Sequence, residues 1–177
     1  MASQHDQDEL LPASGFGLLL YKASAGLALL GGFILLAVVL MTTASVAGRY
    51  LFRMPVPGDY EIVGIGCGIA ILFFFPYCEM ASGNIKASFF TDNLGDRWKQ
   101  LLNMIAEVLF LATAGLLTWR FVMGGLRRMA DGQSYMYTQM PIWWAYIPAT
   151  FAMSLLVIVA VYRLFDYAQR FRSQSST

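Results

Sequence analysis

Residues 18–47 read LLLYKASAGLALLGGFILLAVVLMTTASVA, and Lys22 is the only charged side chain among them. A helix that crosses the hydrocarbon layer of a membrane needs about 20 apolar residues, because each residue advances about 1.5 Å through a layer about 30 Å thick. The stem of Lys22 can extend along the helix so that its ammonium group reaches the membrane interface. The stretch therefore predicts a transmembrane helix.

Three more apolar segments follow, and the predicted spans are residues 22–47, 61–80, 101–124 and 141–163. The chain has 177 residues, of which 58% are hydrophobic and only 13% charged, whereas soluble domains carry roughly 25% charged residues. Backbone groups inside lipid have no water to bind, so each span should be helical. We expect an all-α membrane protein, with a bundle of four transmembrane helices in a domain of residues 17–166.

The connections and tails differ in character. We expect an acidic, disordered N-terminal tail at residues 1–16 and a cytoplasmic C-terminal tail at residues 167–177. Residues 54–58, MPVPG, predict a tight turn, and residues 82–99 mix apolar and charged side chains as a short amphipathic segment on a membrane surface does. Lys and Arg are slightly more frequent on the side that holds both termini, which favours cytoplasmic termini.

Several functions are excluded by what the sequence lacks. Its single histidine, His5, lies in the N-terminal tail, so the spans contain no histidine to ligate haem or a metal ion. No GxxxxGK[ST] motif is present, and no serine or cysteine nucleophile has a histidine partner. The net charge of +1 offers no basic surface to nucleic acid. We expect no enzymatic activity, no cofactor and no nucleic-acid partner.

The third span contains an ionisable side chain, Glu107, about two turns from its start. One face of this helix carries small or polar residues: Gln100, Asn103, Glu107, Ala114 and Thr118. Such a stripe should face other helices rather than lipid. Two interpretations of Glu107 remain open, namely a relay for protons or ions and a satisfied polar contact between helices.

Two further features lie near the start of the second span. Arg49 and Glu61 flank the proline turn, so they could form an ion pair that fixes the hairpin, or they could reach the interface independently. Gly64 and Gly68 form a GxxxG pattern, which permits close helix approach but also arises by chance in membrane helices.

Three motifs together carry a resemblance to a known family. The first span ends in Arg49-Tyr50-x-Phe52, followed by a Pro-x-Pro turn and Tyr60-Glu61. The second ends in EMASGNIK at residues 79–86, and the fourth opens with MPIWWAYIP at residues 140–148. Their order and spacing resemble the small, four-span permease subunit (DctQ-like) of tripartite ATP-independent periplasmic (TRAP) transporters, over roughly residues 25–165.

The resemblance implies a scaffold subunit in the inner (cytoplasmic) membrane of a bacterium, with membrane lipid around it. Its partners would be a large permease subunit, which carries the solute and the coupling ion, and a periplasmic solute-binding protein, which delivers a solute such as an organic acid. The alternative is an autonomous four-helix channel or proton-coupled carrier that uses Glu107. The residues expected to contact the other subunit or the binding protein are Arg49, Arg53, Glu61, Gly64, Gly68, Lys86, Asn103, Glu107, Arg127 and Arg128.

Overall fold

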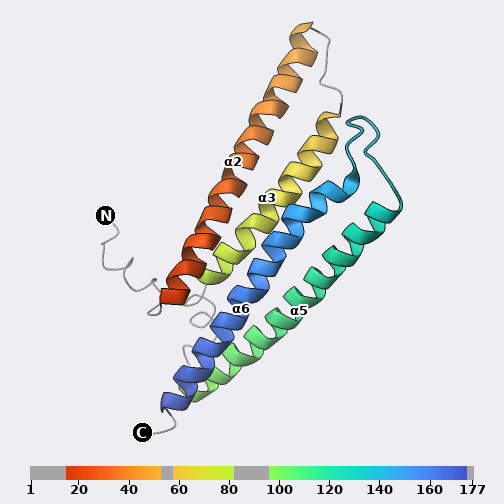
Figure 1. Ribbon diagram of the computed structural model, residues 1–177. Helices are drawn as coiled ribbons and strands as arrows, with labels where there is room; N and C mark the ends of the chain where they lie inside the picture. The colour runs from red at the N-terminus through yellow and green to blue at the C-terminus, as the bar shows by residue number, and fades with distance from the viewer. Residues whose placement is uncertain (1–14, 53–57, 82–95, 175–177) are drawn as a thin grey trace, which may run out of the picture.

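The computed structural model describes residues 15–52, 58–81 and 96–174, and these residues are almost entirely helical (Figure 1). The helices are α2 (Gly15–Phe52), α3 (Asp59–Ala81), α5 (Asp96–Ala130), the 3-10 helix η1 (Ile142–Ala145) and α6 (Tyr146–Gln174). Within the described residues no strand is present, and the only bridge of strand type joins Ser134 to Pro141 in the connection between α5 and α6.

Four of these helices contain stretches that are long and apolar enough to cross a membrane. The stretches are Gly15–Leu51, Asp59–Ala81, Met104–Ala130 and Ile142–Phe165. This confirms the predicted fold class of an all-α membrane protein with four transmembrane helices. The proline turn and most of the predicted amphipathic segment lie outside the described residues, and residues 96–99 of that segment belong to α5.

The helices lie side by side in a row in the order α2, α3, α6, α5 (Figure 1). Each helix packs mainly on its neighbours in this row, so the four helices of the predicted bundle are arranged side by side. A closed bundle is not required here, because lipid accepts apolar side chains as readily as a helix does. Large side chains along α2 are accordingly exposed, among them Leu29, Phe33, Leu36 and Leu40.

The most buried helix is α6, which lies between α3 and α5. Its inward side chains are mostly small or of medium size, and they include Ala152, Met153, Leu156, Val159 and Ala160. Met153 and Leu156 form a core cluster with Ala114 of α5. Helix α6 therefore joins α5, on one side, to the pair α2 and α3 on the other.

The closest approach between α2 and α3 occurs at single glycines. A Cβ atom on Gly66 would lie 2.5 Å from Val38 Cγ2, and a Cβ atom on Gly31 would lie 3.1 Å from the Ala70 carbonyl oxygen. By contrast, a Cβ atom on Gly64 or Gly68 would meet nothing within 4 Å. Gly64 and Gly68 of the GxxxG pattern therefore do not bring two described helices into contact. Gly66, which lies between them in the sequence, packs closely against α2.

Candidate functional site

One end of the row is organised by Asp59, the first residue of α3. Asp59 Oδ2 accepts a 2.8 Å hydrogen bond from the hydroxyl of Ser45 on α2, and Arg49 Nη2 lies 3.4 Å from the same oxygen. Asp59 Oδ1 accepts the backbone N–H of Tyr60 at 2.9 Å, and the negative charge of this carboxylate suits the N-terminus of α3. Of the two interpretations of Arg49 and Glu61, an ion pair between them is wrong, since the partner of Arg49 is Asp59.

Glu61 instead binds the connection between α5 and α6. Its carboxylate accepts the backbone N–H groups of Tyr137 at 3.1 Å and Thr138 at 3.0 Å, and the Thr138 hydroxyl at 3.0 Å. Gly58, at φ +80°, lies against the same two residues, because an added Cβ atom would be 3.0 Å from Tyr137 Cβ. Glu61 thus fastens the start of α3 to a segment 76 positions later in the chain.

That connection folds back on itself, which positions its tip for Glu61. The N–H of Tyr135 donates to the Met140 carbonyl oxygen at 2.9 Å, and the N–H of Ile142 donates to the Gln133 carbonyl oxygen at 3.1 Å. Gln139 adopts a positive φ of 55°, and its side-chain amide donates to the Met136 carbonyl oxygen. The reversal leaves the side chains of Met136 and Tyr137 exposed. They lie at the same end of the row as Asp59 and Arg49, and this end is called the rim below.

The other end of the row contains a buried ion pair between α3 and α6. Arg163 Nη1 lies 2.8 Å from Glu79 Oε1 and also donates to the backbone carbonyl oxygen of Glu79. The two side chains are only 8% and 4% exposed. Sequence reasoning missed this pair, although charges of opposite sign at the ends of two spans on one membrane side were a usable signal.

Glu107 is buried on α5. The Thr118 hydroxyl donates to the Met153 carbonyl oxygen at 3.3 Å, which sets the antiparallel register of α5 and α6. Glu107 lies about three turns from Thr118, and Arg163 lies about three turns from Met153 in the same direction. Glu107 is therefore at the height of Arg163. The prediction that the polar stripe faces another helix is confirmed for Glu107, Ala114 and Thr118.

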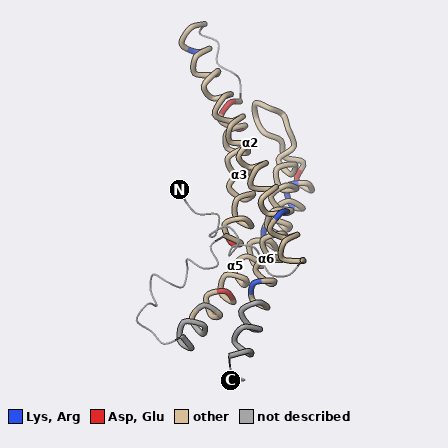
Figure 2. The backbone as a smooth tube through the Cα atoms, turned by 90° about the vertical axis from the view of Figure 1, so that its left-hand side faces the viewer, with Lys and Arg blue, Asp and Glu red and all other residues tan. Residues whose placement is uncertain are grey.

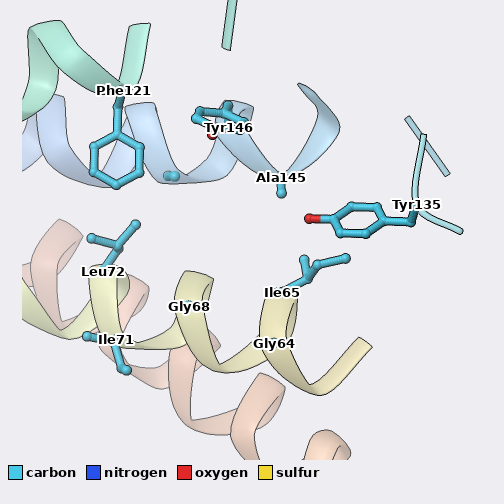
Figure 3. Close-up of a pocket in the computed structure, with 10 residues that line it drawn as sticks. Gly64, Ile65, Gly68, Ile71, Leu72, Phe121, Tyr135, Ala145 and Tyr146 are labelled. Atoms are coloured by element: carbon cyan, nitrogen blue, oxygen red, sulfur yellow. The ribbon is translucent and has the colours of Figure 1, made fainter. Parts of the chain in front are cut away.

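A cavity of about 390 Å³ lies between α3 and the start of α6 (Figure 3). From α3 it is lined by Gly64, Ile65, Gly68, Ile71 and Leu72. The facing residues are Phe121 of α5, Tyr135 of the connection, Ala145 of η1, and Tyr146 and Ala149 of α6. The lining is almost wholly apolar, and Figure 3 shows the Tyr135 hydroxyl pointing towards the space between Ile65 and Ala145.

The remaining predicted contact residues are placed as follows. Arg53 and Lys86 lie outside the described residues, as does the side chain of Asn103. Arg127 is exposed in the last turn of α5, and the neighbouring Arg128 donates through Nη1 to Gln133 Oε1. Figure 2 shows that most of α2 and α3 carries no charge, and that the charged residues of these two helices lie towards the helix ends.

The comparisons with known proteins give one family. A family model described as "Tripartite ATP-independent periplasmic transporters, DctQ component" matches residues 38–170, which include three of the four spans and the last 15 residues of α2. Searches of curated proteins and of solved structures give no match. The matched region covers well over half of the chain and all of the rim and ion-pair contacts described above. The chain belongs to the DctQ component family of tripartite ATP-independent periplasmic transporters.

Proposed function

We propose that this chain is a scaffold subunit that supports the large permease subunit of its transporter and carries no solute itself. Membership of the DctQ family makes it a small membrane subunit of a TRAP transporter. A large permease subunit and a periplasmic binding protein are its proposed partners. We further propose that the transporter takes up a small solute, such as an organic acid, in an ion-driven process that depends on the binding protein.

The observation that carries the proposal is the use of the polar groups within the chain. Asp59 is bound by Ser45 and Arg49, and Glu79 is bound by Arg163. These groups crosslink helices, and the row that they hold together presents broad apolar faces to its surroundings. A scaffold subunit that packs beside another membrane protein needs internally bound polar groups and apolar outer faces. A carrier instead needs polar groups that a solute can reach.

A docking role for the rim follows from the same proposal. With both termini cytoplasmic, the end that holds Arg49, Asp59 and Arg127 faces the periplasm, where the binding protein approaches. Basic side chains there would steer an acidic surface of that protein. Arg127→Glu should lower uptake by the whole transporter and weaken its dependence on salt. Arg172→Glu, near the opposite end of α6, is the matched control and should change neither.

The direct test of the scaffold role is purification of the chain in a mild detergent after co-expression with the large permease subunit. The proposal predicts a stable complex of the two proteins, identified by the mass of the intact assembly. It also predicts that the large subunit, produced without this chain, loses stability and uptake activity. Full uptake by the large subunit and binding protein alone would refute the proposal.

A further inference from the structure

The connection between α5 and α6 carries no charged side chain after Asp131. Residues 132–162, which hold the rest of the connection and most of the following span, contain no Asp, Glu, Lys or Arg. The connection nevertheless exposes large side chains. The apolar and aromatic side chains that are more than half exposed, η1 included, are Met136, Tyr137, Met140 and Trp144. Exposed apolar side chains that gather in one segment mark a surface that meets a protein or a membrane.

Polar groups of this connection are bonded within the chain. The N–H groups of Tyr135 and Ile142 donate to carbonyl oxygens on the opposite arm of the reversal. Those of Tyr137 and Thr138 donate to the Glu61 carboxylate. Three side chains of the connection also bond within the chain, namely Gln133, Thr138 and Gln139. These groups therefore need no water, which suits a segment at the edge of a lipid layer.

The tip of the connection, residues 136–140, lies at the height at which two spans begin. It is bonded to Glu61, the third residue of the span on α3, and Trp144 is the third residue of the span on α6 (Figure 1). From Glu61 to Glu79 helix α3 advances about 27 Å, and from Trp144 to Arg163 the chain advances about 28 Å. The ion pair joins these far ends. The tip is therefore about one hydrocarbon thickness, roughly 30 Å, from the ion pair.

We propose that this tip is immersed in the lipid headgroup layer of the bilayer and anchors the rim there. Tyrosine and tryptophan favour this layer, because their rings are apolar and their O–H or N–H groups can bond to headgroups or water. The exposed Tyr137 and Trp144 lie at the same height, as such an anchor requires. Because Glu61 bonds the tip to α3, the anchor fixes the depth of α3 as well as that of α6.

The charge and height of the tip favour lipid over a soluble partner. A surface without charge offers a soluble protein no ion pairs, whereas Arg49 and Arg127 at the same rim do. The backbone reversal also keeps the tip beside the start of α3 instead of extending it into water. This anchor does not depend on the scaffold role proposed above.

The test measures the depth of position 136 in bilayer nanodiscs, for the chain alone and for its complex with the large permease subunit. A nitroxide label is attached at Met136→Cys, after the free cysteines are removed by Cys67→Ala and Cys78→Ala. Met136 is exposed, so the label has room. Collisions of the label with oxygen, which concentrates in lipid, are compared with collisions with a water-soluble nickel chelate. The same label at Ser176→Cys, in the predicted C-terminal tail, is the aqueous reference.

The proposal predicts frequent oxygen collisions at position 136 and nickel collisions severalfold rarer than at position 176, in both samples. Nickel collisions as frequent as those at position 176 would overturn the proposal, because the tip would then lie in water. Rare collisions with both reagents in the complex would overturn it too, because another subunit would then cover the tip.

Discussion

Arg163 of α6 donates to both the side-chain carboxylate and the backbone carbonyl oxygen of Glu79, 84 positions earlier on α3. The two helices are the middle members of the row, so this buried pair joins the α2–α3 half to the α5–α6 half. At the opposite end of α3, Glu61 joins the same halves through Tyr137 and Thr138. The halves are thus fastened at both ends of one helix.

Removal of Arg163 should destabilise the protein strongly. Arg163→Met leaves the Glu79 carboxylate buried without the positive charge of Arg163. In comparable buried pairs this change lowers the free energy of unfolding by about 3–5 kcal/mol. The double variant Glu79→Leu/Arg163→Met should recover most of this loss, because neither charge is then buried alone. Thermal unfolding in detergent measures both. A double variant as unstable as Arg163→Met would show that Arg163 stabilises the protein mainly through contacts other than its pairing with Glu79.

The two bonds to Asp59 should differ in strength. Ser45 is buried and its hydroxyl is 2.8 Å from Asp59 Oδ2, so Ser45→Ala should cost about 1–3 kcal/mol. The side chain of Arg49 is 53% exposed and its nitrogen is 3.4 Å from that oxygen, so Arg49→Gln should cost less than about 1 kcal/mol. Unfolding free energies of the two variants test the order. A larger effect of Arg49→Gln would reverse our assignment of the main contact.

Loss of the Glu61 carboxylate should loosen the rim without unfolding the helices. Glu61→Ala removes the acceptor of three hydrogen bonds from Tyr137 and Thr138. Amide hydrogen exchange should then accelerate at residues 135–140 and remain slow within α6. Thr138→Val, which removes only the hydroxyl donor, should have a smaller effect in the same segment. Unchanged exchange at Tyr137 and Thr138 in Glu61→Ala would contradict the contact.

Glycines on opposite sides of α3 should respond differently to the same substitution. Gly66→Ala places a Cβ atom 2.5 Å from Val38 Cγ2 and should cost about 1–3 kcal/mol through overpacking. Gly64→Ala meets no neighbour and should be neutral or slightly stabilising, because alanine favours a helix over glycine. Melting temperatures of the two purified variants test this. Equal losses would place Gly64 in a contact as tight as that of Gly66.

The number and position of the helices could be predicted from the sequence because lipid imposes length and apolarity on every span. The burial of Glu107 could be predicted too, since its face also carries Ala114 and Thr118. Both inferences depend on local spacing along one helix, which the sequence displays directly.

The lateral order of the helices could not be predicted, because α2 and α3 are apolar on nearly all faces and no face marks a neighbour. The partner of Arg49 was missed for a related reason. Asp59 and Glu61 are two positions apart and so point about 200° apart around α3, and only the rotation of that helix decides which faces α2. The pairing of Glu79 with Arg163 depends on the same unknown rotation and on the helix order.

The measurement that tests the scaffold account most directly uses vesicles that contain this chain alone. Proton entry is followed with a trapped pH-sensitive dye, and sodium entry with a radioactive tracer, under an imposed membrane potential. The account predicts the rates of empty vesicles for the wild type and for Glu107→Gln alike. Ion entry that requires the chain and disappears in Glu107→Gln would contradict it and establish an autonomous carrier or channel.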